Sequence, residues 1–242
     1  MSNLLIEIGN TALKASWADG MTLGKTFRYQ GENKLDFITS LIDCNSIPDL
    51  LVIASVYEIS SSFEKRIKSL CKNYLILDSK HKEIIKSLDL PDYLSFDRVA
   101  SIVASRYLFG GRSCSIFDFG TTITADFLDS DGNYLMGRLS LGCMSRFKAL
   151  NRYSKNVPLI TLVSNEKEKE DDYKYSIKEG VVSGIMFEIQ GWIDDKSSNV
   201  VVFTGGDAIY FAKRMKNSIF VICNLVLIGL ALIAKNYVEQ DN

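Results

Sequence analysis

Two short stretches of this chain combine the residue types that bind phosphate groups and their cations. In Ser115–Asp126, a strand-like run ends at Asp118, and Gly120 and the hydroxyls of Thr121 and Thr122 follow before strand-forming residues resume. Glycine at such a turn permits a positive φ and lets an anion approach the backbone, while a carboxylate is a ligand for hard cations. The stretch therefore predicts a hairpin tip that holds phosphate and a cation.

The amino terminus repeats this arrangement. Leu4–Lys14 also reads as strand, acid, glycine, polar residues and strand, with Glu7, Gly9, Asn10 and Thr11 at the turn. The acids of the two stretches are 111 residues apart. Two copies of one pattern at this separation predict a duplicated domain whose two phosphate tips face one cleft.

Both tips are followed by hairpin strands and then by alternating helices and strands. Leu50–Val56 is a continuous apolar run, which predicts a central strand buried on both faces. Val200–Phe203 predicts another, and the Gly-Gly pair of Thr204–Asp207 after it would let a nucleoside approach the backbone. The pattern predicts an α/β fold that resembles two ribonuclease-H-like domains of the actin, Hsp70 and sugar-kinase superfamily. We expect these domains at 1–114 and 115–242, with an active-site cleft between them.

A further acid begins the helix expected between the halves. Within Leu88–Leu108, Pro91 ends the preceding element, Ser95 is a suitable N-cap, and apolar residues recur at helical spacing. Asp97 and Arg98 then fall in the first helical turn. Because the helix dipole favours an acid there in any protein, residue type alone leaves open whether Asp97 is catalytic or an ordinary N-terminal charge.

The composition excludes several other kinds of function. Lys and Arg total 28 against 29 Asp and Glu, so the chain lacks the basic surface that nucleic acid requires. Its five cysteines are scattered without a C-x-x-C spacing, which favours reduced thiols. The single histidine, His81, lies in a charged run and is expected to be solvated, so we expect neither a zinc site nor a histidine-based triad.

One apolar segment could be either a membrane-spanning helix or part of the hydrophobic core. Ile219–Ala234 has 16 residues, fewer than the roughly 20 that a spanning helix needs, and Asn224 and Gly229 interrupt it. A buried strand running into a buried helix explains the segment better. With no signal-peptide pattern at the amino terminus, we expect a cytoplasmic protein without a membrane partner.

Five motifs together resemble one enzyme family over nearly the whole chain. They are EIGNTALK (7–14), SFDR (95–98), DFGTTITAD (118–126), TGGDA (204–208) and NLVLIGLALIAKN (224–236). Their order and spacing resemble those of type III pantothenate kinase. The resemblance implies two ribonuclease-H-like domains, a homodimer, and phosphorylation of pantothenate by ATP in the first step of coenzyme A synthesis. It also implies Mg²⁺ with the ATP and a monovalent cation, K⁺ or NH₄⁺.

The resemblance also assigns roles to individual residues. Asp97 corresponds to the proposed catalytic base, Asp118 to the ligand of the monovalent cation, and Thr121 to a contact with ATP. The first tip corresponds to the family's phosphate-binding residues, here Glu7, Ile8, Gly9, Asn10, Thr11, Ala12, Leu13 and Lys14. The substrate-binding set corresponds to Leu88, Ser95, Phe96, Asp97, Arg98 and Tyr173.

Four of these positions depart from the family's usual residues. Glu7 stands where the family has Asp, and Ser95 where it has Gly. Leu88 aligns with a tyrosine, and Tyr173 aligns with a threonine that binds substrate. The last two leave the shape of the substrate pocket open.

Two other functions fit the same fold. One is a kinase of another small alcohol, such as a sugar, and the other is a non-catalytic accessory protein that keeps the nucleotide pocket. Loss of Asp97 or Asp118 would favour the second alternative, and both residues are present.

Overall fold

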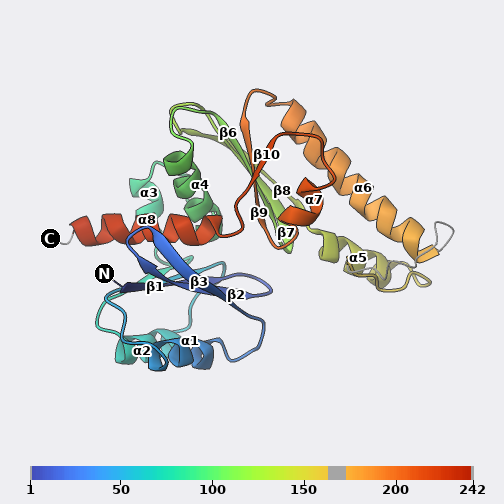
Figure 1. The fold of residues 1–242 in the computed structure, drawn as a ribbon. Coiled ribbons are helices and arrows are strands. Elements are labelled where there is room, and N and C mark those ends of the chain that lie inside the picture. Colours follow the sequence, from blue (N-terminus) through green and yellow to red (C-terminus); the bar gives the residue numbers. More distant parts are fainter. Residues whose placement is uncertain (1, 163–172, 241–242) are drawn as a thin grey trace. The chain divides into compact units, whose positions relative to one another are not determined.

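The computed structural model describes residues 2–162 and 173–240, which form two compact units. Met1–Leu108 and Asn224–Asn242 make up the first unit, and Phe109–Cys223 make up the second. Each unit contains one five-stranded sheet with helices packed on it, so the α/β expectation is confirmed (Figure 1).

The sheet of the first unit has the order β3-β2-β1-β4-β5. The first three strands form antiparallel hairpins, while β4 and β5 run parallel to β1. The bounds are β1 (Ser2–Ile8), β2 (Leu13–Asp19), β3 (Thr22–Tyr29), β4 (Leu51–Ser55) and β5 (Tyr74–Leu77). All five residues of β4 are buried, as expected of a central strand.

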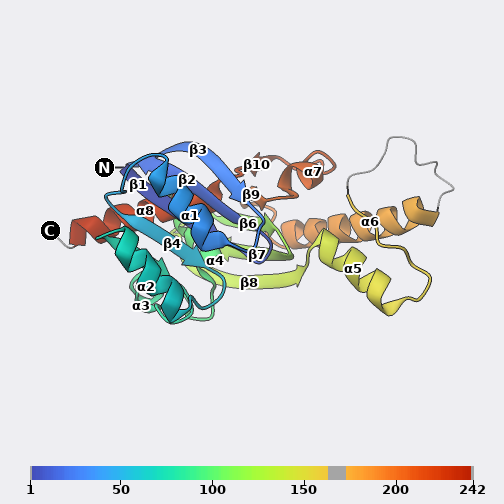
Figure 2. The same cartoon turned by 90° about the horizontal axis from the view of Figure 1, so that it is seen from below.

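Alternation along β1 divides the side chains of the first unit between two faces. Leu4, Ile6 and Ile8 pack in a core with Ile38 of α1 (Lys34–Asp43) and Ile67 of α2 (Ser61–Leu70), the side seen in Figure 2. Because successive strand residues point to opposite faces, Glu7 projects to the other face. The helices on that face are α4 (Phe96–Leu108) and α8 (Leu225–Gln240) (Figure 1).

The last helix departs from the expected domain boundary. A division at 114/115 places the carboxyl terminus in the second domain, whereas α8 packs on α4 and on β1, β2 and β4 of the first unit. The helical part of the apolar run is therefore buried as expected. The short strand before it, β10 (Ile219–Val221), is not buried as expected, because its Phe220 and Val221 side chains are exposed. Within the described residues, no helix has the length and apolar character that crossing a membrane requires.

The sheet of the second unit repeats that of the first, position for position. Its order is β10-β9-β6-β7-β8, again with three strands in antiparallel hairpins and two parallel neighbours. The other bounds are β6 (Cys114–Phe119), β7 (Thr122–Leu128), β8 (Tyr134–Leu141) and β9 (Val200–Gly205). The expected duplication is thus present in the topology.

Aromatic side chains build the core of the second unit. The Phe119 ring lies 4.6 Å from that of Phe203 and 5.1 Å from that of Phe211, centroid to centroid. Alternation places Phe117 and Phe119 of β6 on one face. The helices that contribute to this core are α5 (Cys143–Tyr153), α6 (Tyr173–Asp194) and α7 (Ala208–Ala212). This aromatic packing supports the end of β6.

His81 is not simply solvated. Its Nδ1 lies 2.8 Å from Oδ1 of Asp78, a carboxylate that is 1% exposed. Asp78 also accepts hydrogen bonds from the backbone N–H of Ile59 (2.8 Å) and of Lys80 (3.0 Å). Asp78 therefore joins the segment after β4 to the segment after β5, next to the short helix α3 (Glu83–Ser87).

Substitution of Asp78 should destabilise the first unit. Burial raises the pKa of Asp78, but the hydrogen bonds from Ile59, His81 and Lys80 more than offset this, and the pKa lies below its usual value. Asp78→Ala leaves two backbone N–H groups without their acceptor, so we expect a loss of roughly 2–4 kcal/mol at pH 7. A carboxylate whose pKa is lower in the folded state stabilises the fold fully only at a pH above its pKa in the unfolded chain. The difference in stability between the parent and Asp78→Ala should therefore shrink as the pH falls below about 4.

Thermal unfolding at several pH values measures this effect. The control is Asp43→Ala, which removes an exposed acid at the end of α1 and should change the melting temperature little. Equal melting temperatures of parent and Asp78→Ala at pH 7 would contradict the structural role.

Candidate active site

The first tip is a tight turn that exposes backbone and polar side chains. Gly9 N donates to Ala12 O (3.0 Å), which closes the hairpin and leaves Asn10 and Thr11 exposed at its end. Ile8 and Leu13 flank the turn and belong to the hydrophobic core. Among the eight predicted phosphate-binding residues, these two side chains therefore hold the hairpin in place, and the exposed turn is what a phosphate can reach.

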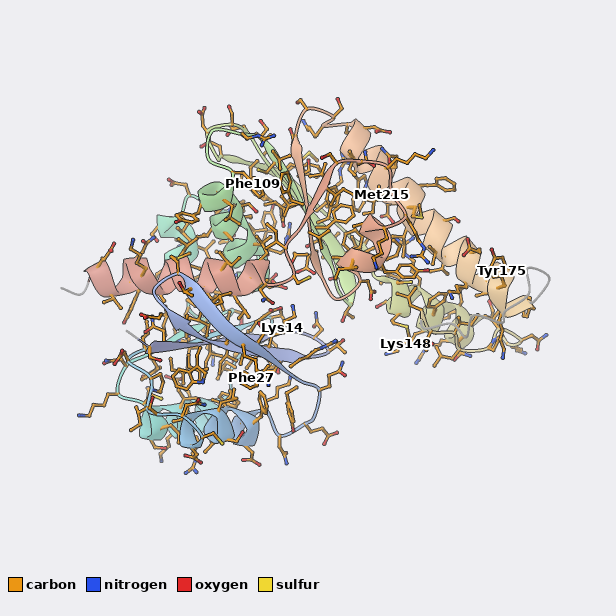
Figure 3. All side chains as sticks on the ribbon, in the orientation of Figure 1. Lys14, Phe27, Phe109, Lys148, Tyr175 and Met215 are labelled. Carbon is orange, nitrogen blue, oxygen red and sulfur yellow. The ribbon has the colours of Figure 1, made fainter. Side chains whose placement is uncertain are left out.

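Glu7 and Lys14 form a pair at the base of this hairpin. They are directly opposite in the β1–β2 register, and Lys14 Nζ lies 3.3 Å from Glu7 Oε2 (Lys14 is labelled in Figure 3). The Glu7 side chain is 11% exposed, and its Oε2 makes no hydrogen bond to the described residues beyond this ion pair. Burial raises the pKa of Glu7, the charge of Asp97 raises it further, and Lys14 lowers it.

The charge of Asp97 contributes to the raised pKa of Glu7, although 90 residues separate the two in the chain. Asp97 is half-buried in the first turn of α4, and its Oδ1 accepts a hydrogen bond from Arg98 N (2.9 Å). The first unit thus gathers two carboxylates and an ammonium group on the α4 face of its sheet. Such a group of charges suits a phosphate, its metal ion and a proton transfer.

The residues around Glu7 fit a magnesium ion. A buried carboxylate oxygen without a hydrogen bond gains from a divalent cation, and Mg²⁺ commonly binds through one or two carboxylates together with substrate phosphates. Among the described residues, no cluster of three or more His, Cys, Asp or Glu side chains is arranged to hold a metal by itself. The ion would therefore bind with the nucleotide rather than in a closed protein site.

The predicted substrate residues are only partly brought together. Ser95 and Arg98 are half-buried beside Asp97, but the Phe96 side chain is 2% exposed and packs in the core. Leu88 O accepts a hydrogen bond from Arg106 Nη1 (2.8 Å), which ties Leu88 to the last turn of α4 rather than the first. Tyr173 is 56% exposed at the start of α6 in the second unit. The charged segment 163–172 lies outside the described residues.

In the second unit, Asp118 lies at the end of β6 against the turn after β9. Gly205 has a φ of +94°, and a Cβ at this position would overlap Asp118 Oδ1 and lie 2.6 Å from Phe119 N. Asp207 N donates to Phe119 O (3.2 Å), so the Thr204–Asp207 turn folds onto the end of β6. The candidate nucleoside turn and the candidate cation ligand are therefore neighbours in the second unit.

The second tip is anchored by a contact that the sequence motifs do not indicate. Gly120 N donates to Thr122 O (3.1 Å) and closes the tip. Thr121 O accepts from Gly142 N (3.0 Å) and from Ser145 Oγ (2.6 Å), at the start of α5. In the sequence, a glycine before a helical pattern indicates where α5 begins, but it does not indicate that the start of α5 contacts the second tip.

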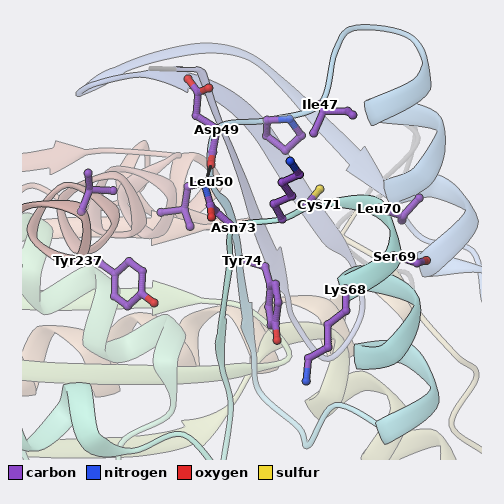
Figure 4. Close-up of a pocket in the computed structure, with 13 residues that line it drawn as sticks. Ile47, Asp49, Leu50, Lys68, Ser69, Leu70, Cys71, Asn73, Tyr74 and Tyr237 are labelled. Carbon is purple, nitrogen blue, oxygen red and sulfur yellow. Dashed lines mark hydrogen bonds between the residues drawn. The ribbon is translucent and has the colours of Figure 1, made fainter. Parts of the chain in front are cut away.

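Described residues of the first unit line a hollow beside the first tip and another away from it. One, of about 640 Å³, adjoins the first tip and is lined by Asn10, Thr11, Lys34 and Tyr57 among others. The larger, of about 970 Å³, is lined by Asp49, Tyr74 and Tyr237 among others (Figure 4). Because it lies where β4 and β5 begin, it is at the opposite end of the parallel strands from the tip. Ligands of parallel α/β sheets bind at the carboxyl ends, which favours the smaller hollow as part of the site.

Solved structures share the fold across the full chain. A protein described as a Baf family transcriptional activator from Campylobacter jejuni superposes with a TM-score of 0.62 at 20% identity, covering 98% of this chain and 99% of that one. The ROK hexokinase from Thermus thermophilus superposes with a TM-score of 0.53 at 12% identity, covering 98% and 100%. At these identities the likeness concerns the fold, which is that of the actin, Hsp70 and sugar-kinase class.

Sequence relatives narrow this class to one family. The type III pantothenate kinase from Flavobacterium johnsoniae is 30% identical, over 98% of this chain and 99% of its own length. That from Phocaeicola vulgatus is 34% identical, over 94% and 96%. The family model for type III pantothenate kinase matches residues 3–195. The chain belongs to the type III pantothenate kinase family.

Proposed function

We propose that this chain transfers the γ-phosphoryl group of ATP to pantothenate, the first step of coenzyme A biosynthesis. The observation that carries the proposal is family membership over nearly the whole chain. The grouping of Glu7, Lys14 and Asp97 on one face supports it independently, since it combines a phosphate tip, a cation and a candidate base.

In the proposed mechanism, Asp97 accepts the proton of the primary hydroxyl of pantothenate. The alcohol oxygen then bonds to the γ-phosphorus, the bond from that phosphorus to the bridging oxygen breaks, and ADP leaves. Phosphoryl transfer requires mainly alignment and neutralisation of charge, so one positioned base on a rigid helix is sufficient protein chemistry. The half-buried carboxylate in the first turn of α4 suits this role.

The nucleotide is proposed to bind at both hairpin tips. The exposed backbone of the turn at Asn10 and Thr11 and the ammonium of Lys14 would contact the phosphates, and Thr121 would contact ATP from the second tip. Glu7 would hold Mg²⁺ together with the ATP phosphates, and the ion would neutralise part of their charge. Asp118 binds the monovalent cation, supported by its place at the end of β6 next to Thr204 of β9.

The pantothenate site is proposed to include Ser95, Arg98 and Tyr173, with the backbone of Leu88 and Phe96 in supporting positions. The guanidinium of Arg98 complements the carboxylate of pantothenate.

A homodimer is part of the proposal, supported by the exposed apolar side chains of Leu139 and Phe187 in the second unit (65% and 77% exposed). A cytoplasmic location stays a prediction.

A coupled assay of ADP release tests the proposed substrate. Pantothenate should support turnover, while sugars and other small alcohols at the same concentration should give little. Turnover with a sugar instead would favour the alternative kinase. No turnover with any alcohol, together with measurable ATP binding, would favour the non-catalytic accessory protein.

Glu7 departs from the family's aspartate and provides a separate prediction. Glu7→Gln keeps the length of the side chain and removes its charge, so it should raise the magnesium requirement and lower the rate by well over tenfold. Because burial raises the pKa of Glu7, its ionised form does not favour folding, and the variant should melt at or above the parent's temperature.

Glu7→Asp is the matched control for charge. It should cost less than Glu7→Gln, because a water molecule between carboxylate and Mg²⁺ can adapt to the shorter side chain. Rates across a magnesium titration decide the matter. If Glu7→Gln has the parent's rate and magnesium dependence, Glu7 does not act on the metal.

A further inference from the structure

Helices α4 and α8 are in close backbone contact where Gly229 meets Ala100. A Cβ at Gly229 would overlap the carbonyl oxygen of Ala100 and lie 2.7 Å from its Cα. The two helices lie side by side in the first unit (Figure 1). The atoms in the way belong to backbone, which cannot rotate aside as the end of a flexible side chain can.

The crossing lies one helical turn from the proposed base. Asp97 precedes Ala100 by three residues on α4. With 3.6 residues per helical turn, the two residues are therefore less than one turn apart along the helix. Val99 and Ala100 are fully buried, which leaves this part of α4 little room to move independently. A displacement at Ala100 is therefore transmitted to Asp97 as a movement of the helix start.

On its other side, α8 is held against the sheet. It packs on β1, β2 and β4, and its Leu227 and Leu230 side chains are fully buried. Within the first turn of α4, Val99 N donates to Ser95 O and Arg98 N donates to Asp97 Oδ1. The extensive packing of α4 against α8 contributes to where this turn lies relative to the sheet that carries Glu7.

We infer that Gly229 is a positioning residue for the phosphoryl transfer: the absence of a side chain there sets where α4, and with it Asp97, lies relative to the sheet that carries Glu7. The inference rests on the proposed role of Asp97 as the base. Any side chain at position 229 pushes Ala100 back by on the order of 1 Å. A misplacement of about 1 Å in a reacting group can cost roughly 10²-fold in rate.

Gly229→Ala tests the inference with the smallest possible side chain. The control is Gly191→Ala in α6, where a Cβ has no heavy atom within 4 Å. Helix propensity favours alanine at both positions, so the control should keep its rate and its stability. We expect kcat of Gly229→Ala to fall by about 10- to 100-fold, with the KM for ATP within about threefold of the parent's.

Two further measurements separate the possible outcomes. If Gly229→Ala is unstable at the assay temperature, it is assayed in sucrose or trimethylamine N-oxide, which favour the folded state. A restored kcat would assign Gly229 to stability alone and overturn the inference, as would a kcat within about threefold of the parent's without osmolyte. Asp97→Asn is assayed in parallel. If Asp97→Asn is active, Asp97 is not the base. If Asp97→Asn is inactive while Gly229→Ala is fully active, Asp97 can still be the base, and only the positioning role of Gly229 is refuted.

Discussion

Asp97→Asn should leave a folded protein that has lost most of its turnover. Asparagine has the size of aspartate, and its Oδ1 can still accept the hydrogen bond from Arg98 N that the structure shows at 2.9 Å. It cannot take a proton from the alcohol. We therefore expect kcat to fall by about 10² to 10⁴-fold, the usual contribution of a general base, with ATP binding retained.

The control separates catalysis from the ordinary effect of an acid at a helix start. Glu64 lies in the first turn of α2, and Glu64→Gln removes a comparable charge far from the proposed chemistry. This variant should lose little stability and no activity, because a surface charge at a helix terminus contributes about 0.3–1 kcal/mol. A rate for Asp97→Asn within threefold of the parent would make Asp97 only a helix-start charge.

Asp118→Asn should remove both most of the activity and its dependence on the monovalent cation. The parent should turn over faster in potassium or ammonium than in sodium or Tris buffer, by on the order of tenfold or more. The carboxylate of Asp118 lies over Gly205, beside the candidate nucleoside turn, where a bound cation would offset the charge of ATP. Without that carboxylate, the choice of cation should no longer change the remaining rate.

Steady-state rates in the four buffers at constant ionic strength measure this dependence. Asp195→Asn is the control, because Asp195 is an exposed acid of the same unit that pairs with Arg138 at the surface. It should keep the parent's cation preference. Equal parent rates in all four buffers would remove the proposed role of Asp118.

The local patterns of the sequence determined the two hairpins, their tips and the central strands. The alternation of side chains along a strand can be recognised from a few adjacent residues. The position of Glu7 and Asp118 at strand ends could therefore be predicted from the sequence alone. The repeated topology followed from the repeated pattern. The helix that carries Asp97 was also predictable, because its N-cap and apolar spacing are local signals.

Only the tertiary structure decided which of these elements meet. That the charge of Asp97 affects the pKa of Glu7, or that Asp78 joins two loops by accepting a hydrogen bond from Ile59 N, depends on contacts between distant parts of the chain. The same reason moved α8 into the first unit, where Gly229 is a close helix crossing rather than an interruption of an apolar run. Periodicity tells which face of a helix is apolar, but the partner that covers this face is selected by packing of the whole unit.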